Sequence, residues 1–140
     1  MTRSGNRLNL EEFGYMKLDD MTYAVRGCVF EVFKELGPGL LESVYVASLA
    51  HELSIHGLKV RCQVGLPVTY KETSLDLGFR IDLLVENELL VEVKSVEALH
   101  PVHSKQLLTY LRLSNRKLGL LVNFNVVKIE DKVSLIRIIN

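Results

Sequence analysis

The chain has 140 residues, of which 48% are hydrophobic and 24% charged, and its 17 basic and 17 acidic residues give a formal net charge of zero. This length suits one domain with a single core, and the composition excludes a disordered chain. No apolar run reaches the roughly 18 residues that a membrane-spanning helix needs, and residues 1–10 lack the apolar core of a signal peptide, so the sequence predicts a soluble, unexported, cytoplasmic protein.

The first 36 residues predict an arm followed by a helix. Residues 1–18 mix charges, Gly and Asn without sustained periodicity, which is typical of a weakly ordered arm. Asp19 or Asp20 can cap a helix over Met21–Leu36, because an aspartate oxygen accepts from the free N–H groups of a first turn. We therefore expect residues 19–140 to form the folded domain.

A second helix is predicted over Leu40–His56. Gly37-Pro38-Gly39 ends the first helix, and Gly57 closes the second. Apolar residues of this segment predict one buried face, made of Leu41, Val44, Tyr45, Leu49 and Leu53.

The middle of the chain has the pattern of strands. Residues 58–70 form the first apolar-rich segment, although Gly65 and Pro67 indicate a bend or bulge. Two further apolar runs, Leu77–Val85 and Leu89–Lys94, flank three polar residues and predict a hairpin.

The last part of the chain predicts a helix and two strands. The helix covers Val102–Ser114 after a proline, and the strands cover Leu118–Phe124 and Val133–Ile139. Apolar strands with helices able to cover both faces predict an α/β sandwich, with a central mixed sheet flanked by helices.

Three charged residues interrupt the apolar strands of the predicted hairpin. Glu92 and Lys94 point the same way, because side chains alternate along a strand. A turn centred on Asn87 places Asp82 opposite Glu92 and on that same face. Two carboxylates and an ammonium group then converge in an apolar sheet.

This arrangement predicts a divalent-metal site. Two carboxylates about 4 Å apart repel by roughly 4 kcal/mol at an effective dielectric near 20, and one lysine neutralises only one of them. Mg²⁺ prefers a few carboxylates with waters and phosphate oxygens, so Asp82, Glu92 and the backbone carbonyl of Val93 are candidate ligands. Lys94 would orient or help deprotonate an attacking water, or stabilise charge on a phosphate. A structural ion pair of Lys94 with Glu92 or Asp82 is the alternative, and these residues alone do not decide between the two.

Two helices add polar residues to the candidate site. Gln106 and Tyr110 are four residues apart and share one helix face, from which both can donate to a phosphate or to the acids. An ordinary amphipathic helix explains this pair as well. Glu42 lies in the first turn of the second helix, where the helix dipole favours a carboxylate. Tyr45, one turn on, is expected in the core rather than as a ligand.

Basic side chains flank the two polar residues of the third helix. Lys105 and Arg112 are candidate phosphate contacts, although a solvated helix face accounts for them equally well. His100 and His103 lie at the start of this helix and are expected to be exposed or capping. Zero net charge counts against a stand-alone, tight nucleic-acid binder, but it is compatible with a nuclease whose acidic metal site offsets a basic groove.

The motifs together resemble a known family. Gly39-x-x-Glu42-x-x-Tyr45 is similar to the signature of the GxxExxY proteins, members of the PD-(D/E)XK nuclease superfamily. The resemblance runs from about Met21 to near the C-terminus. Each motif alone is permissive, but all of them in this order are specific: 35–45, 79–85, 91–94, 101–103, 106–110 and 119–124. Phe33 departs from the pattern, because many relatives carry a histidine there.

The resemblance implies a restriction-endonuclease-like fold and a role for each charged residue. Asp82 and Glu92 match the metal-binding acids of the superfamily, and Lys94 matches its catalytic lysine. Glu42 matches the helical acid that completes the site, and the resemblance implies that it is a further metal ligand beside Asp82 and Glu92. The implied cofactor is Mg²⁺ or Mn²⁺.

The resemblance also implies a substrate. Gln106 and Tyr110 match a QxxxY element that holds the substrate backbone or braces the site. The implied activity is phosphodiester hydrolysis by metal-activated water, on DNA in preference to RNA. The alternative is a non-catalytic nucleic-acid- or protein-interaction module that retains the nuclease fold. No membrane partner is expected, and a homodimer is a further expectation left open.

Overall fold

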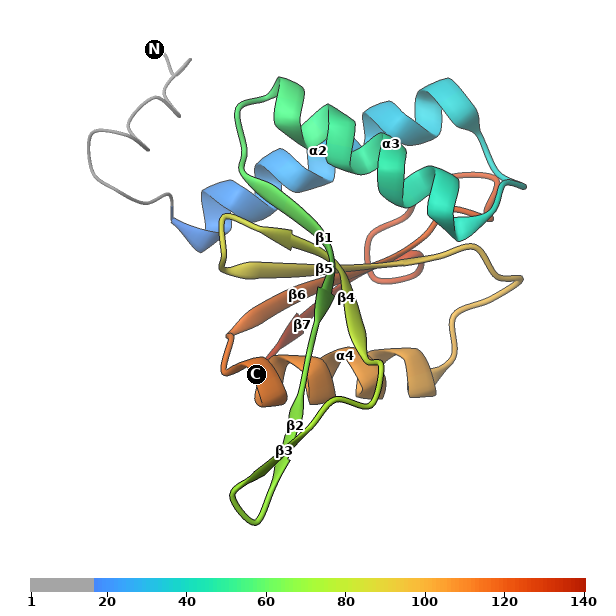
Figure 1. Cartoon of the computed structure of the whole chain (residues 1–140). Coiled ribbons are helices and arrows are strands. Elements are labelled where there is room, and N and C mark those ends of the chain that lie inside the picture. The colour runs from blue at the N-terminus through green and yellow to red at the C-terminus, as the bar shows by residue number, and fades with distance from the viewer. Residues whose placement is uncertain (1–16) are drawn as a thin grey trace.

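The computed structural model describes residues 17–140, so residues 1–16 of the predicted arm lie outside the described part. The helices within it are α2 (Leu18–Leu36), α3 (Glu42–Ile55) and α4 (Pro101–Ser114) (Figure 1). The strands are β1 (Val60–Gly65), β2 (Val68–Tyr70), β3 (Thr73–Leu75), β4 (Arg80–Val85), β5 (Leu89–Lys94), β6 (Leu118–Asn123) and β7 (Leu135–Ile139). Among the described helices, none combines the length and apolar character needed to cross a bilayer.

One five-stranded sheet forms the centre, in the order β1-β4-β5-β6-β7. β5 and β6 run parallel, whereas the other neighbours are antiparallel. α4 connects the parallel pair, since parallel neighbours need a crossover rather than a tight turn. α2 and α3 cover one face and α4 the other (Figure 1). The predicted α/β sandwich, with a mixed central sheet flanked by helices, is confirmed.

Two apolar clusters hold the helices on the sheet. On the side of α2 and α3, the ring of Tyr45 stacks on that of Phe124 with centroids 4.4 Å apart. On the other side, Leu107 and Leu111 of α4 pack against the sheet. β5 is buried on both faces, which explains why its sequence is almost unbroken in apolar residues.

The two N-terminal helices differ from prediction at their starts. α2 begins at Leu18, so Asp19 and Asp20 lie in its first turn, where the helix dipole favours acids, and neither caps it. Asp19 instead pairs with Arg137 at 2.9 Å. Leu41 was predicted in the buried face of the second helix but is 74% exposed, because it precedes α3 in an extended conformation and is out of helical phase. Val44 is 39% exposed and lies outside that face too.

The strand predicted over residues 58–70 is two strands. β1 ends at Gly65 and the chain leaves the sheet, since Pro67 has no N–H for a sheet ladder. β2 and β3 pair only with each other and project from the body below α4 (Figure 1). β4 therefore begins at Arg80 rather than Leu77. We call residues 68–75 the projecting hairpin.

A glycine on β6 lets α4 lie close to the sheet. A Cβ atom on Gly119 would lie 3.0 to 3.1 Å from three side-chain carbons of Leu107. We expect Gly119→Ala to lower the free energy of unfolding by about 1–3 kcal/mol, the usual cost of overpacking a core, in urea titration. Gly27→Ala is the control: Gly27 is an exposed position of α2 with open space around it, and this change should stabilise by roughly 0.5–1 kcal/mol. Equal stability of Gly119→Ala and the wild type would contradict the close packing.

Candidate functional site

The three charged residues of β4 and β5 lie on the face of the sheet that α4 covers. Leu84 of β4 pairs with Leu90 of β5, as the predicted register requires, and both pack beneath α4. Because alternate side chains of a strand share a face, Asp82, Glu92 and Lys94 lie on this side too. The site is thus at the end of β5.

Asp82 and Glu92 are adjacent where the two strands separate. Beyond the last regular backbone pair, Oδ2 of Asp82 accepts from the N–H of Val93 at 2.8 Å. The N–H of Asp82 faces Oε1 of Glu92 at 3.5 Å. Side-chain carboxylates therefore take the places of backbone acceptors at this open end of the β4–β5 pair.

Burial raises the pKa of both carboxylates. Glu92 is 5% exposed, and desolvation together with the negative charge of Asp82 raises its pKa to about 8. Desolvation also raises the pKa of Asp82, against the opposing effects of the Val93 hydrogen bond and the Lys94 charge. Two buried acids that repel each other form a strong candidate for a cation site.

Lys94 lies beside the acids without closing an ion pair with either. Its positive charge lowers the pKa of Asp82 and of Glu92, so the ammonium group is within electrostatic reach of both. Within residues 17–140, the ion pairs of 4.0 Å or less lie elsewhere, and Lys94 takes part in none of them. The alternative interpretation, a structural ion pair of Lys94 with Glu92 or Asp82, does not describe this geometry.

Glu42 reaches the site from the helical layer on the other face. Its Oε2 accepts from the backbone N–H of Ser95, directly after β5, at 3.2 Å, and Ser95 Oγ donates to the carbonyl of Leu40 at 2.6 Å. The hydroxyl of Tyr45 donates to the carbonyl of Gly37 at 2.6 Å and accepts from the N–H of Leu40 at 3.2 Å. Tyr45 is fully buried, which confirms the expectation that it belongs to the core. The hydrogen bonds of residues 37–42 therefore hold the start of α3 against the end of β5.

Gln106 and Tyr110 form a hydrogen-bonded pair on α4. Nε2 of Gln106 donates to the Tyr110 hydroxyl at 3.2 Å. Desolvation, followed by the charges of Glu92 and Asp82, raises the pKa of Tyr110. The structure thus brings the Tyr110 hydroxyl within electrostatic reach of both acids, and its ring packs against Phe79 with centroids 6.0 Å apart.

Two residues around the site were not predicted from the sequence. The side chain of Gln63, on β1, hydrogen-bonds to Asp82 and opposes the rise of its pKa. Asn123, at the buried end of β6, accepts from the N–H of Val96 at 3.0 Å and donates to its carbonyl at 2.9 Å, fixing the chain that follows Lys94. A polar amide closing an apolar strand was a signal for Asn123. Gln63 has no such signal, because its partner is brought in by the β1–β4 pairing.

The two histidines at the start of α4 have a capping role. Nδ1 of His103 accepts from the N–H of His100 at 2.9 Å, which confirms the prediction of capping histidines. Desolvation and the charge of Lys94 lower the pKa of His103, which favours the neutral ring. Because Nδ1 is the acceptor, the proton of the neutral ring is on Nε2.

Asp82 and Glu92 together provide two carboxylates for a hard divalent cation. Among residues 17–140, no three His, Cys, Asp or Glu side chains converge closely enough to hold a metal ion. Glu42, held by Ser95, affects the pKa of Glu92 less than Asp82 does. Mg²⁺ commonly takes only one or two carboxylates and keeps several waters, so Asp82 and Glu92 fit it.

The backbone carbonyl of Val93 points toward the strand of Asp82, as a further metal ligand would. The N–H of Phe124 donates to the carbonyl of Lys94 at 2.9 Å, so that carbonyl points toward β6. Successive carbonyls of a strand point to opposite sides, so that of Val93 points toward β4, where Asp82 lies. A backbone oxygen beside two carboxylates is a donor set for a hard divalent cation.

Lys105 and Arg112 are both exposed on α4. They are seven residues apart, about two helical turns, and so lie on one side of the helix. Between Pro101 and Ser114 the chain has no acidic residue. This side of α4 is therefore locally basic in a protein of zero net charge.

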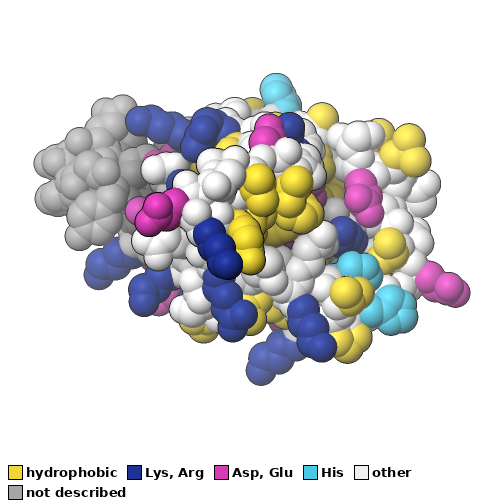
Figure 2. Space-filling view, turned by 60° about the horizontal axis from the view of Figure 1, so that its bottom comes forward, with side chains coloured by type: hydrophobic (Ala, Val, Ile, Leu, Met, Phe, Trp, Pro, Cys, Tyr) yellow, Lys and Arg dark blue, Asp and Glu magenta, His cyan; other side chains and the backbone are white. Residues whose placement is uncertain are grey.

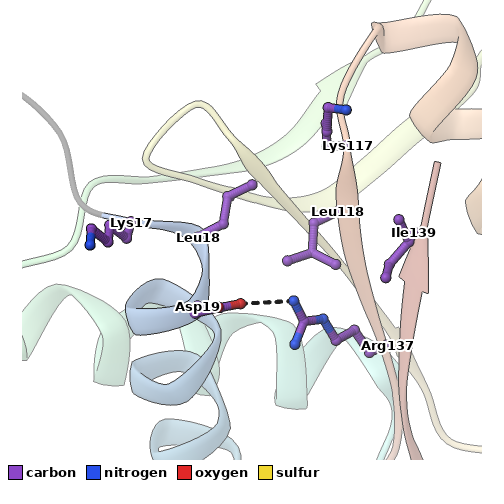
Figure 3. A pocket seen from close by; sticks show the side chains of 7 residues that line it. All are labelled: Lys17, Leu18, Asp19, Lys117, Leu118, Arg137 and Ile139. Carbon is purple, nitrogen blue, oxygen red and sulfur yellow. Dashed lines mark hydrogen bonds and ion pairs between the residues drawn. The ribbon is translucent and has the colours of Figure 1, made fainter.

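A pocket of about 260 Å³ lies away from these residues, at the opposite end of β6 from Asn123 (Figure 3). The ion pair between Asp19 and Arg137, at 2.9 Å, lies within it. It is lined by Lys17, Leu18, Asp19, Lys117, Leu118, Arg137 and Ile139. None of the predicted site residues lines it, so we place the chemistry at the charged residues and not at this pocket.

A mixed sheet with two acids and a lysine at the end of neighbouring strands, enclosed by helices, defines an α/β domain of the nuclease-like class. The model of the PD-(D/E)XK nuclease superfamily matches residues 19–137, and the chain belongs to this superfamily. The match shows the superfamily, and the resemblance to the GxxExxY proteins within it stays an expectation from the sequence. No curated protein and no solved structure matches the chain. Membership supports a nuclease-like function.

Proposed function

We propose that the protein is a Mg²⁺- or Mn²⁺-dependent nuclease that hydrolyses phosphodiester bonds, on DNA in preference to RNA. The observation that carries the proposal is the buried pair Asp82 and Glu92, which Lys94 approaches without neutralising through an ion pair. Such a pair is costly to keep charged unless a cation binds it. Superfamily membership supports nucleic acid as the substrate class.

Each acid has a separate task in this proposal. Asp82, Glu92 and the carbonyl of Val93 would hold the cation, and Glu42 would add negative charge from the start of α3. The cation would supply Lewis-acid activation of a water molecule and of the phosphate. The Val93 hydrogen bond orients Asp82, and the Ser95 hydrogen bond orients Glu42.

The remaining residues act on the substrate in this proposal. Lys94 would stabilise negative charge on the reacting phosphate or orient the attacking water, because its ammonium group is within electrostatic reach of both acids. The hydrogen-bonded Gln106 and Tyr110 would contact the substrate backbone from α4. Their placement on the face of the acids supports this role.

A metal titration tests the proposal. Purified protein is incubated with labelled single-stranded and double-stranded DNA, and with RNA of the same sequence, over a range of Mg²⁺ and Mn²⁺ concentrations. We expect cleavage of DNA that requires either cation and stops on chelation. Cleavage that persists with excess chelator, or no cleavage of any substrate with either cation, would contradict the proposal.

The basic side of α4 makes a prediction about salt. Lys105→Gln and Arg112→Gln should each weaken DNA binding, since each removes one phosphate contact. Each should also reduce the steepness of the fall of log affinity with log salt concentration by about one. Fluorescence anisotropy in a chelator, over a series of salt concentrations, measures both quantities. Lys34→Gln, at an exposed position of α2 on the other side of the sheet, is the control and should leave the slope unchanged. Unchanged slopes in the α4 variants would remove these residues from the interface.

A non-catalytic interaction module is the second candidate. Zero net charge favours it, as does the absence of three converging ligand side chains within residues 17–140. It predicts nucleic-acid or protein binding that is independent of metal and unaffected by Glu92→Gln. The nuclease proposal predicts that the same change prevents metal-induced stabilisation.

A further inference from the structure

The projecting hairpin extends from the end of the sheet that carries the acids. It connects β1, which carries Gln63, to β4, which carries Asp82, so its two stems are the strands of the site. Leu66, at its base, is buried in the cluster beneath α4, and its N–H donates to the carbonyl of Phe79 at 2.9 Å. The base is therefore fixed relative to the site, whereas β2 and β3 pair with no other strand of residues 17–140.

The hairpin closes with a tight turn. Tyr70 pairs with Thr73, leaving a two-residue loop of Lys71 and Glu72. Both loop residues have positive φ, 47° and 70°, which is the tight turn whose twist matches that of paired strands. An isolated two-stranded hairpin buries little surface and adds little stability, so the packing of the core does not account for it.

One face of the hairpin presents an aromatic side chain. Val68, Tyr70, Thr73 and Leu75 share this face, because the pairs are Val68 with Leu75 and Tyr70 with Thr73. Tyr70 is 61% exposed at the tip. The Nζ atom of Lys71 lies 5.5 Å from the centroid of the Tyr70 ring, so a cation accompanies the aromatic group.

Two further exposed apolar side chains lie in the chain between this tip and the site. Leu77 is 60% exposed and Phe79 is 37% exposed, and the Phe79 ring packs against Tyr110. Figure 2, which brings this end of the molecule forward, shows hydrophobic side chains gathered in the centre with Lys and Arg side chains beside them. Exposed aromatic side chains beside basic ones are the combination that binds unpaired nucleic acid, since bases stack on rings and phosphates pair with cations.

We propose that the projecting hairpin is a stacking platform for an unpaired DNA strand, with Tyr70 receiving a base at the tip and Phe79 lying nearer the acids. The proposal rests on the proposed nuclease function, because the strand held by the hairpin is the one led to Asp82 and Glu92. It assigns single-stranded DNA, or the unpaired end of a duplex, as the substrate class. Duplex DNA hides the faces of its bases in the stack, so an exposed ring offers it nothing comparable.

The absence of Trp from the chain makes Tyr70→Trp a unique fluorescent reporter. Its emission is followed while unlabelled oligothymidylate of about 20 nucleotides is added in a chelator, a length sufficient for a typical single-strand site. We expect quenching on binding, because the indole ring stacks on a base. Tyr23→Trp, at a position 76% exposed on α2, is the matched control and should not respond.

Affinity provides a second readout with labelled oligothymidylate. Tyr70→Ala should weaken binding at least about fivefold, and Tyr70→Phe should retain it, since stacking needs the ring and not the hydroxyl. Neither change should alter the slope of affinity against salt, which separates stacking from the phosphate contacts of α4. Tyr23→Ala should bind like the wild type.

Each contrary result has a distinct meaning. Normal binding with no response at position 70 would overturn the platform and leave the nuclease proposal standing. Quenching with no cleavage in Mg²⁺ or Mn²⁺ would support the platform while overturning the nuclease. Equal quenching by a blunt duplex, or self-association of the wild type that Tyr70→Ala abolishes, would overturn the assignment of an unpaired strand. No binding of any DNA by the wild type in the chelator would overturn the platform, and no cleavage with either cation would overturn the nuclease proposal as well.

Discussion

Replacing Asp82 or Lys94 by alanine should abolish metal-dependent DNA cleavage, lowering the rate at saturating metal by about 10³-fold or more. The reason differs for the two residues. Asp82→Ala removes one of two adjacent carboxylates that would hold the cation, and Lys94→Ala removes the cationic side chain within electrostatic reach of them. Initial rates on single-stranded DNA, measured over a range of Mg²⁺, give the loss and show whether more metal restores activity.

Loss of folding must be separated from loss of chemistry at Asp82. Its carboxylate accepts from the N–H of Val93, so alanine also leaves that backbone donor without its partner, at a cost of about 1–3 kcal/mol. Asp82→Asn keeps an acceptor oxygen but removes the charge, and should be inactive with a thermal stability near that of the wild type.

An acid close in sequence provides the matched control. Glu97→Gln, at an exposed position after β5, should retain wild-type activity. Glu42→Gln should cost less than Asp82→Asn, because Ser95 already holds Glu42 and its influence on Glu92 is the weaker one. Activity of Asp82→Asn or Lys94→Ala comparable with the wild type, in a preparation free of contaminating nuclease, would exclude this site.

Metal-free protein should lose stability as the pH rises from about 5 to 8, and Glu92→Gln should remove most of that loss. Burial and the charge of Asp82 raise the pKa of Glu92 from 4.5 to about 8. A raised folded-state pKa means that the folded protein holds the proton more tightly than the unfolded chain. The stability due to protonation is therefore complete below pH 4.5 and is lost as the pH rises through about 8.

The size of this effect makes it easy to measure. The difference between the two pKa values corresponds to roughly 5 kcal/mol, shared with Asp82, whose pKa is raised in the same direction. Urea titrations in a chelator at several pH values give the wild-type profile. Glu92→Gln carries no charge there, so at pH 8 it should be the more stable protein, whereas near pH 5 the two should be alike.

Added cation completes the experiment. Mg²⁺ or Mn²⁺ should stabilise the wild type at pH 8, where the carboxylates are charged, and should not stabilise Glu92→Gln. Asp131→Asn is the control, because the Arg26 guanidinium lowers the pKa of Asp131 and places its titration below this pH range. A flat wild-type profile in chelator, or equal stabilisation of both proteins by metal, would contradict a buried cation-binding pair.

The sequence by itself determined most of the fold and the central part of the site. The helices and the β4–β5 pair follow from periodic apolar residues and turn residues, which act over short stretches of chain. The register that puts Asp82 beside Glu92 follows from a turn centred on Asn87 together with strand alternation. Because these rules are local, they could be applied without knowing the rest of the structure.

Only the tertiary structure decided how the site is completed. Glu42 contacts the N–H of Ser95 across 53 positions of sequence, and Gln63 meets Asp82 because β1 pairs with β4. The position of Lys94 beside Asp82 and Glu92, without an ion pair to either, and the projecting hairpin likewise depend on where strands separate. Strand separation, burial and pairing between distant segments depend on the packing of the whole chain, so periodicity and spacing could identify the charged residues but not their surroundings.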